Sequence, residues 1–96
     1  MKPSEALRRH REEIRRIVES GNAANPRVFG SVLYGRDTEA SDLDILVDPT
    51  QVTTMFDIGT IRYRLRDLLA VSVDVLTPKA LHENMRDAVL SEARPI

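Results

Sequence analysis

The feature that most constrains the fold is a pair of aspartates set two positions apart within an apolar run. Asp42 and Asp44 alternate with Leu43, Ile45 and Val47 in the segment SDLDILV. In a β-strand, side chains two positions apart point to the same side of the sheet. We therefore expect a strand over residues 42–47, with both carboxylates on one face and the aliphatic side chains on the other.

Two carboxylates held side by side repel each other, and the arrangement is costly unless a cation lies between them. A third aspartate, Asp74, lies in the later apolar run 71–76, where it faces away from the valines of that run. On neighbouring strands, the three carboxylates would reach one face of the sheet. Such oxygen ligands suit Mg²⁺ or Mn²⁺ rather than zinc. Taken alone, Asp74 could instead cap a strand or pair with an arginine such as Arg62 or Arg64.

A Gly-Ser pair precedes the paired aspartates by ten residues. The sequence predicts a short strand over residues 27–29 that ends at Gly30, a helical turn over residues 31–34 and a polar loop over residues 36–41. A glycine at a strand end lets the backbone approach a ligand closely, and exposed N–H groups with the Ser31 hydroxyl can hold phosphate oxygens. The pattern therefore indicates a nucleoside-triphosphate site in which the aspartates hold two metal ions about 3.5–4 Å apart.

The other elements follow from apolar periodicity and from capping residues. We expect helices over residues 4–20, 53–70 and 83–93, a turn over residues 22–26, a strand over residues 71–76 and a short helix opening at Thr77-Pro78. A helix between the second and third strands favours a parallel pair, and the short connection between the first two favours an antiparallel pair. The predicted fold is α/β (α+β), with helices packed on a small mixed three-stranded sheet.

Length and composition limit the classes of function. The 96 residues predict a single domain over residues 1–96, and a net charge of −1 gives no overall attraction to nucleic acid or membrane. Cysteine is absent and no apolar stretch resembles a signal or membrane span, so we expect a cytoplasmic protein without membrane or direct nucleic-acid binding. Arginines on the first helix form either a solvated face or a patch that touches RNA or an acidic partner.

The combination Gly30-Ser31, ten residues, Asp42-Leu43-Asp44, and then an aspartate inside a later strand is far more specific than any of its parts. It resembles the motif of the DNA-polymerase-β-like nucleotidyltransferases, and the small size resembles their minimal (MNT) branch. The resemblance covers about residues 4–90. It implies a nucleotidyltransferase fold and transfer of a nucleoside monophosphate, usually AMP from ATP, to a hydroxyl group.

The resemblance also implies roles for single residues. Asp42 and Asp44 would ligate both metal ions, and Asp74 would ligate the catalytic ion and help to deprotonate the attacking hydroxyl. Gly30, Ser31, Arg36 and Ser41 would bind the nucleotide. Similar sequences often carry a basic residue at position 34, where this chain has Tyr34, so Arg36 would have to supply the missing positive charge.

Many domains of this branch are antitoxins paired with a HEPN-type toxin ribonuclease, which they silence by adenylylating a tyrosine. The resemblance therefore predicts an Mg²⁺-dependent adenylyltransferase that acts on a toxin partner, with homo- or hetero-oligomers possible. Two alternatives stay open. The chain could be a non-catalytic antitoxin that masks the toxin by binding it, or a nucleotidyltransferase that acts on a small molecule or RNA. The short chain has no second domain to grip such an acceptor, which disfavours the last of these.

Overall fold

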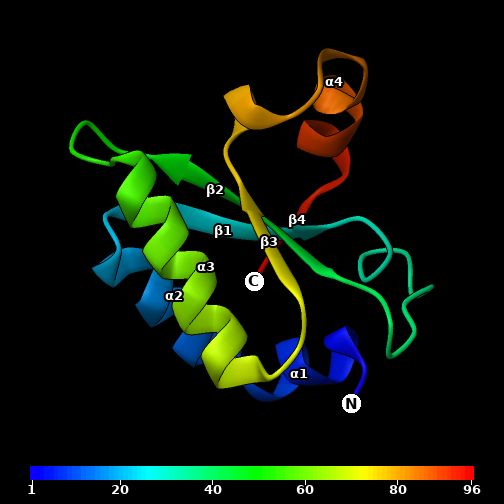
Figure 1. Cartoon of the computed structure of the whole chain (residues 1–96). Coiled ribbons are helices and arrows are strands. Elements are labelled where there is room, and N and C mark those ends of the chain that lie inside the picture. Colours follow the sequence, from blue (N-terminus) through cyan, green and yellow to red (C-terminus); the bar gives the residue numbers. More distant parts are fainter.

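The structure, a computed structural model, describes all 96 residues of the chain. The elements, in order, are α1 (Pro3–Arg9), α2 (Arg11–Ser20), β1 (Ala23–Phe29), β2 (Leu43–Pro49), α3 (Met55–Leu69), β3 (Val73–Leu76), the 3₁₀ helix η1 (Pro78–Ala80), α4 (Glu83–Glu92) and β4 (Arg94–Pro95). The sheet has the order β3-β2-β1-β4 (Figure 1). β1 runs antiparallel to β2 and β4, and β2 runs parallel to β3, which confirms the predicted mixed sheet.

The predicted number of strands is wrong, because the sheet has four. β4 pairs with β1 through Arg27 opposite Pro95 and Val28 opposite Arg94, and the Ile96 N–H donates to the Pro26 carbonyl at 3.0 Å. A two-residue strand that contains a proline shows no alternation of apolar residues. Only the pairing with β1 reveals it.

The predicted first helix is divided at His10, which ends α1 with φ −124° and ψ 26°. The break changes the direction of the chain (Figure 1). It allows Leu7 of α1 and Ile14 of α2 both to be buried in one core. The apolar residues keep a helical period on both sides of His10, so the sequence alone does not predict the break.

The turn predicted over residues 22–26 is mostly strand, since β1 begins at Ala23. Asn25 and Pro26 nevertheless disturb the strand, because its register with β2 shifts between Ala24 and Arg27 and Asn25 has φ +53°. An irregularity of this kind lets a proline and a left-handed residue lie within a sheet. The predicted turn is therefore wrong over residues 23–26, where the chain stays in β1 and is only locally distorted.

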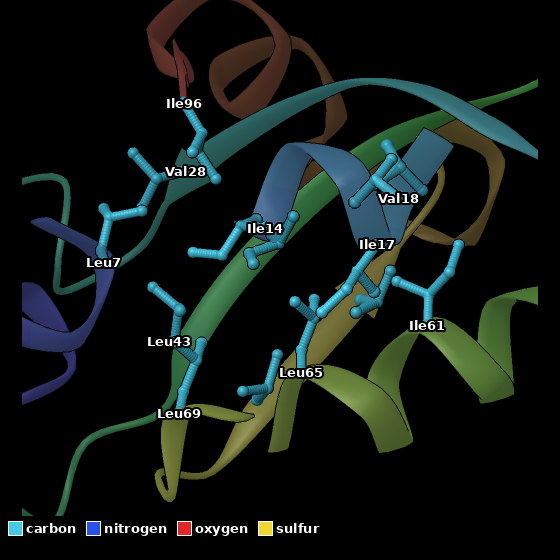
Figure 2. Close-up of a cluster of buried hydrophobic side chains, with 14 of the residues drawn as sticks. Leu7, Ile14, Ile17, Val18, Val28, Leu43, Ile61, Leu65, Leu69 and Ile96 are labelled. Carbon is cyan, nitrogen blue, oxygen red and sulfur yellow. The ribbon is translucent and has the colours of Figure 1, made fainter. Parts of the chain in front are cut away.

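The sheet separates two hydrophobic clusters. On one face, α1, α2 and α3 pack against the sheet, with Ile14, Ile61 and Leu65 completely buried (Figure 2). On the other face, Phe29 and Leu46 form a smaller cluster with Leu81 and with Val89 of α4. Since Asp44 is two positions from Leu46, its carboxylate lies on the same face as α4.

α3 begins at a capping box, in which the Thr54 hydroxyl accepts from the Asp57 N–H at 3.1 Å and the Asp57 carboxylate accepts from the Thr54 N–H at 2.8 Å. Met55 and Phe56 fit the apolar period of this helix but are 90% and 87% exposed, because the first turn extends beyond the core. None of the helices combines the length and the apolar character needed to span a membrane.

Candidate active site

Gly30 turns the chain at the end of β1 and lies against the side chain of Asp44. Its φ is +73°, and a Cβ added to it would lie 2.2 Å from Oδ2 of Asp44. A glycine is therefore needed twice here, for the left-handed backbone and for the close approach. The Tyr34 N–H donates to the Gly30 carbonyl at 3.4 Å, and the Arg36 N–H donates to the Ser31 carbonyl at 2.9 Å. The predicted helical turn after Gly-Ser is present.

The two predicted carboxylate strands are neighbours, and two of the three aspartates are in direct register. Asp44 on β2 pairs with Asp74 on β3, and Phe29 of β1 is the partner of Asp44 on the other side. Asp42 immediately precedes β2 and is exposed. Burial, followed by the negative charges of Asp74 and Asp42, raises the pKa of Asp44 to about 6. The carboxylates are therefore close enough to repel one another.

Asp74 also has a cationic neighbour, which matches the alternative that its sequence context left open. Nη2 of Arg62 lies 3.9 Å from its carboxylate, and Nε of Arg62 donates to the Val73 carbonyl at 3.0 Å. As the side chains stand, no group of three or more acidic, histidine or cysteine side chains is arranged to hold a metal ion. The metal-ligating roles of Asp42, Asp44 and Asp74 stay a prediction.

The donor chemistry of the site nevertheless fits a hard divalent cation. All three side chains offer carboxylate oxygens, which Mg²⁺ and Mn²⁺ prefer. Asp44 has no ion pair within the chain. Its pKa is raised first by burial and then by the negative charges of Asp74 and Asp42, and a cation would relieve that repulsion. Gly30 keeps one side of this carboxylate free of a side chain.

A cavity of about 350 Å³ lies beside Asp44, between the Gly30 turn and α4. Its walls are mainly apolar, and they include Phe29, Leu33, Met85 and Val89. Asn84, at the start of α4, adds an amide. Volumes of this size and lining are typical of small-ligand sites. Sequence reasoning missed the α4 residues, because only the folded chain brings residues 84–92 next to Asp44.

The predicted nucleotide-binding residues are divided between the cavity and the loop next to it. Gly30 lines the cavity, whereas Ser31, Arg36 and Ser41 do not. The guanidinium of Arg36 lies over the ring of Tyr34, 5.7 Å from its centre. Ser41 closes the polar loop, since its hydroxyl accepts from the Thr38 N–H at 2.9 Å. Their roles toward a nucleotide stay predictions.

Tyr34 occupies the cavity mouth, and its hydroxyl donates a hydrogen bond to Glu92 of α4. That bond, followed by partial burial and the charge of Glu92, raises the pKa of Tyr34. The hydrogen bond therefore connects the turn after Gly30 to the last turn of α4.

The fold agrees with what comparisons with known proteins find. The chain belongs to the nucleotidyltransferase domain family, whose family model matches residues 7–96. It is similar to a structure described as a candidate minimal nucleotidyltransferase, with 38% identity, a TM-score of 0.86, and coverage of 97% of this chain and 95% of the other. Its class is thus that of the minimal nucleotidyltransferases.

Two further comparisons concern proteins named for activity or assembly. The chain is 31% identical over 86 residues to the protein adenylyltransferase MntA of Thermococcus cleftensis, covering 90% of this chain and 84% of the relative. It also shares its fold with a toxin–antitoxin structure with AMP-PNP, at a TM-score of 0.73 and 17% identity, covering 88% of this chain and 69% of the other.

Proposed function

We propose that this protein transfers AMP from ATP to a hydroxyl group of a partner toxin and thereby acts as an antitoxin. The observation that carries the proposal is the register of Asp44 with Asp74 on neighbouring strands. Next to Asp44 lies Gly30, a position that has no room for a side chain. Membership of the nucleotidyltransferase family supports the reaction class. The name of the Thermococcus relative supports a protein as the acceptor.

In this proposal the acceptor hydroxyl oxygen attacks the α-phosphorus of ATP. The bond between the α-phosphorus and the bridging oxygen breaks, pyrophosphate leaves, and the proton of the hydroxyl passes to the carboxylate of Asp74. The backbone at Gly30-Ser31 positions the phosphates, and the cavity beside Asp44 shields the reacting groups from water. We expect Arg36 and Ser41 to assist in nucleotide binding.

Asp42, Asp44 and Asp74 would hold Mg²⁺, with two ions expected and Mn²⁺ as a substitute. The metal would supply charge stabilisation to the phosphate oxygens. For Asp74 to join the set, its carboxylate must exchange the 3.9 Å contact with Arg62 for the cation. Burial is the main cause of the raised pKa of Asp44, and the charges of Asp74 and Asp42 add to it; the bound cation would relieve the part that comes from repulsion.

A protein acceptor suits the surface of this chain. Met55 and Phe56 expose large apolar side chains on one turn of α3, and exposed patches of this kind often mark protein contacts. We expect the partner to be a HEPN-type toxin and the acceptor to be a tyrosine.

The experiment incubates the purified protein with Mg²⁺, ATP labelled at the α-phosphate, and the protein encoded by the neighbouring gene. We expect label on the partner and release of pyrophosphate. Asp44→Asn should abolish transfer, whereas Asp67→Asn, the same change at an exposed α3 position without an ion pair, should not. If the wild type silences its partner without labelling it, and the Asp44→Asn variant silences the partner equally well, the protein is a masking antitoxin.

Calorimetry separates the same two functions without a partner. The proposed enzyme should bind ATP only when Mg²⁺ is present, and Asp44→Asn should lose that binding. A masking protein has no need of metal-dependent nucleotide binding. In that case neither the wild type nor Asp44→Asn would show heat of ATP binding in the presence of Mg²⁺.

A further inference from the structure

A second cavity, of about 290 Å³, lies where α1, the start of α2, β1 and β4 meet. Its floor is aliphatic and is formed by the buried side chains Leu7, Val28 and Val32. Its rim carries the exposed arginines Arg8, Arg11 and Arg94. These come from three separate elements, and we refer to the hollow as the arginine cavity.

The three rim arginines have no ion pair within the chain, in contrast to Arg15, Arg27 and Arg62, which pair with Glu12, Asp48 and Asp74. Three like charges around one hollow repel each other. Arg11 is moreover the first residue of α2, where the helix dipole disfavours a cation. An anionic ligand would relieve the repulsion among the three arginines and the unfavourable position of Arg11.

We propose that the arginine cavity docks an acidic, aliphatic peptide segment of the protein acceptor. Carboxylates of the segment pair with the guanidinium groups, whose fork geometry matches them. An aliphatic side chain of the segment fills the floor over Leu7 and Val28. The inference rests on the proposed function, because it gives the acceptor of that reaction its binding site.

The position of the arginine cavity suits a docking site separate from the reacting groups. Val28 on its floor faces the α1–α2 side of the sheet, whereas its neighbour Phe29 faces the α4 side, where Asp44 lies. Figure 2 shows Leu7 and Val28 close together at one end of the main core. The phosphates of a nucleotide held by Asp44 would therefore not occupy the arginine cavity.

The two cavities are nevertheless connected along the surface. Leu33 lines both of them, and a third hollow between them is lined by Leu33 and Arg94 together with Tyr34 and Glu92. A peptide that enters at the rim arginines can follow this path around Leu33. Its next residues then reach the cavity beside Asp44, where the acceptor hydroxyl is needed.

The lining favours a peptide over nucleic acid. Single-stranded RNA is usually held by aromatic side chains on which bases stack, and the arginine cavity has no aromatic residue in its lining. The chain as a whole carries a net charge of −1, so it has no overall attraction to a phosphate backbone.

The test measures fluorescence anisotropy of a labelled peptide of alternating glutamate and leucine, without ATP or metal. The variant Arg8→Glu/Arg94→Glu removes two rim charges. The control Arg9→Glu/Arg16→Glu makes the same change in charge at exposed positions of α1 and α2 outside the cavity. We expect the rim variant to weaken peptide binding about tenfold or more, and the control to weaken it far less. Added salt should weaken the wild-type complex.

In the binding assay, three results would overturn the inference: no peptide binding, equal weakening in both double variants, or tighter rim-dependent binding of an oligoadenylate RNA than of the peptide. If transfer to the partner fails while peptide binding depends on the rim, the proposed function is wrong and the docking site stands. If transfer succeeds and its KM is unchanged in the rim variant, the docking site is wrong.

Discussion

Gly30 and Asp44 lie so close that a side chain at position 30 would overlap the carboxylate of Asp44. A Cβ on Gly30 would lie 2.2 Å from Oδ2 and 3.2 Å from Cγ of Asp44. The strand end that positions the Gly-Ser backbone therefore also fixes where the Asp44 carboxylate can stand. A substitution at either residue therefore changes the packing of the other.

Gly30→Ala should cost stability and activity together. The left-handed φ of +73° costs an alanine about 1 kcal/mol, and the overlap with Asp44 adds to this. Gly35→Ala is the matched control, because Gly35 has φ +68° but nothing within 4 Å of an added Cβ. Urea unfolding should show a loss in both variants, whereas metal-dependent ATP binding should fall only in Gly30→Ala. Equal ATP binding in the two variants would contradict the role given to the close contact.

Asp44→Asn should stabilise the protein at neutral pH in the absence of divalent metal. The folded protein raises the pKa of Asp44 to about 6, above its ordinary 3.8. Stability from this group is therefore fully present below pH 3.8 and is lost as the pH rises through about 6. Thermal unfolding from about pH 4 to about pH 8 should show the two proteins alike in acid and the variant ahead above pH 6. A difference that does not change with pH would disprove the assignment.

Asp37→Ala should loosen the loop that connects the Gly-Ser turn to Asp42. Asp37 is only 8% exposed, and its Oδ2 accepts from the Ser4 N–H at 2.9 Å, thereby capping the start of α1. Burial alone would raise the pKa of Asp37, but hydrogen bonds from Ser4 hold it below its ordinary value. We expect a loss of about 1–2 kcal/mol in urea unfolding. Glu39→Ala, in the same loop but exposed, should change stability little; a similar loss in both would refute the capping role.

The sequence was most informative where residue type and backbone conformation require each other. Alternation of Asp42 and Asp44 with aliphatic residues predicted the β2 strand and the face that carries the carboxylates. A helix between two apolar runs predicted the parallel pairing that brings Asp44 beside Asp74. Gly30 was expected to let the backbone approach a ligand closely; the structure shows its close contact with Asp44, and its role toward a ligand stays a prediction.

What the sequence could not provide depends on contacts between distant segments. β4 exists only through its pairing with β1, and the α4 wall of the cavity follows from packing of Val89 on Phe29 and Leu46. Met55 and Phe56 fit the apolar period of α3 but are exposed, because periodicity does not tell where a helix passes beyond the sheet. Asp37 was read as part of a polar loop, because its partner, the backbone of Ser4, lies 33 residues away.

Asp48→Asn should destabilise the protein through the end of the sheet opposite the candidate site. Arg27 donates to both carboxylate oxygens of Asp48, at 3.0 and 3.1 Å, and Asn25 adds a bond of 3.0 Å beside the register shift between β1 and β2. The hydrogen bond from Arg27 is the main cause that lowers the pKa of Asp48 below 3.8. The stability that the Asp48 carboxylate contributes is therefore present above pH 3.8 and is lost as the pH falls through the lowered pKa of the folded state. Because Asp48 is partly exposed, we expect the variant to lose about 1 kcal/mol at neutral pH and progressively less in acid. Urea unfolding at neutral pH and in acid checks this, with Asp67→Asn as the unpaired control. A loss of stability that persists unchanged in acid would show that the ion pair is not its source.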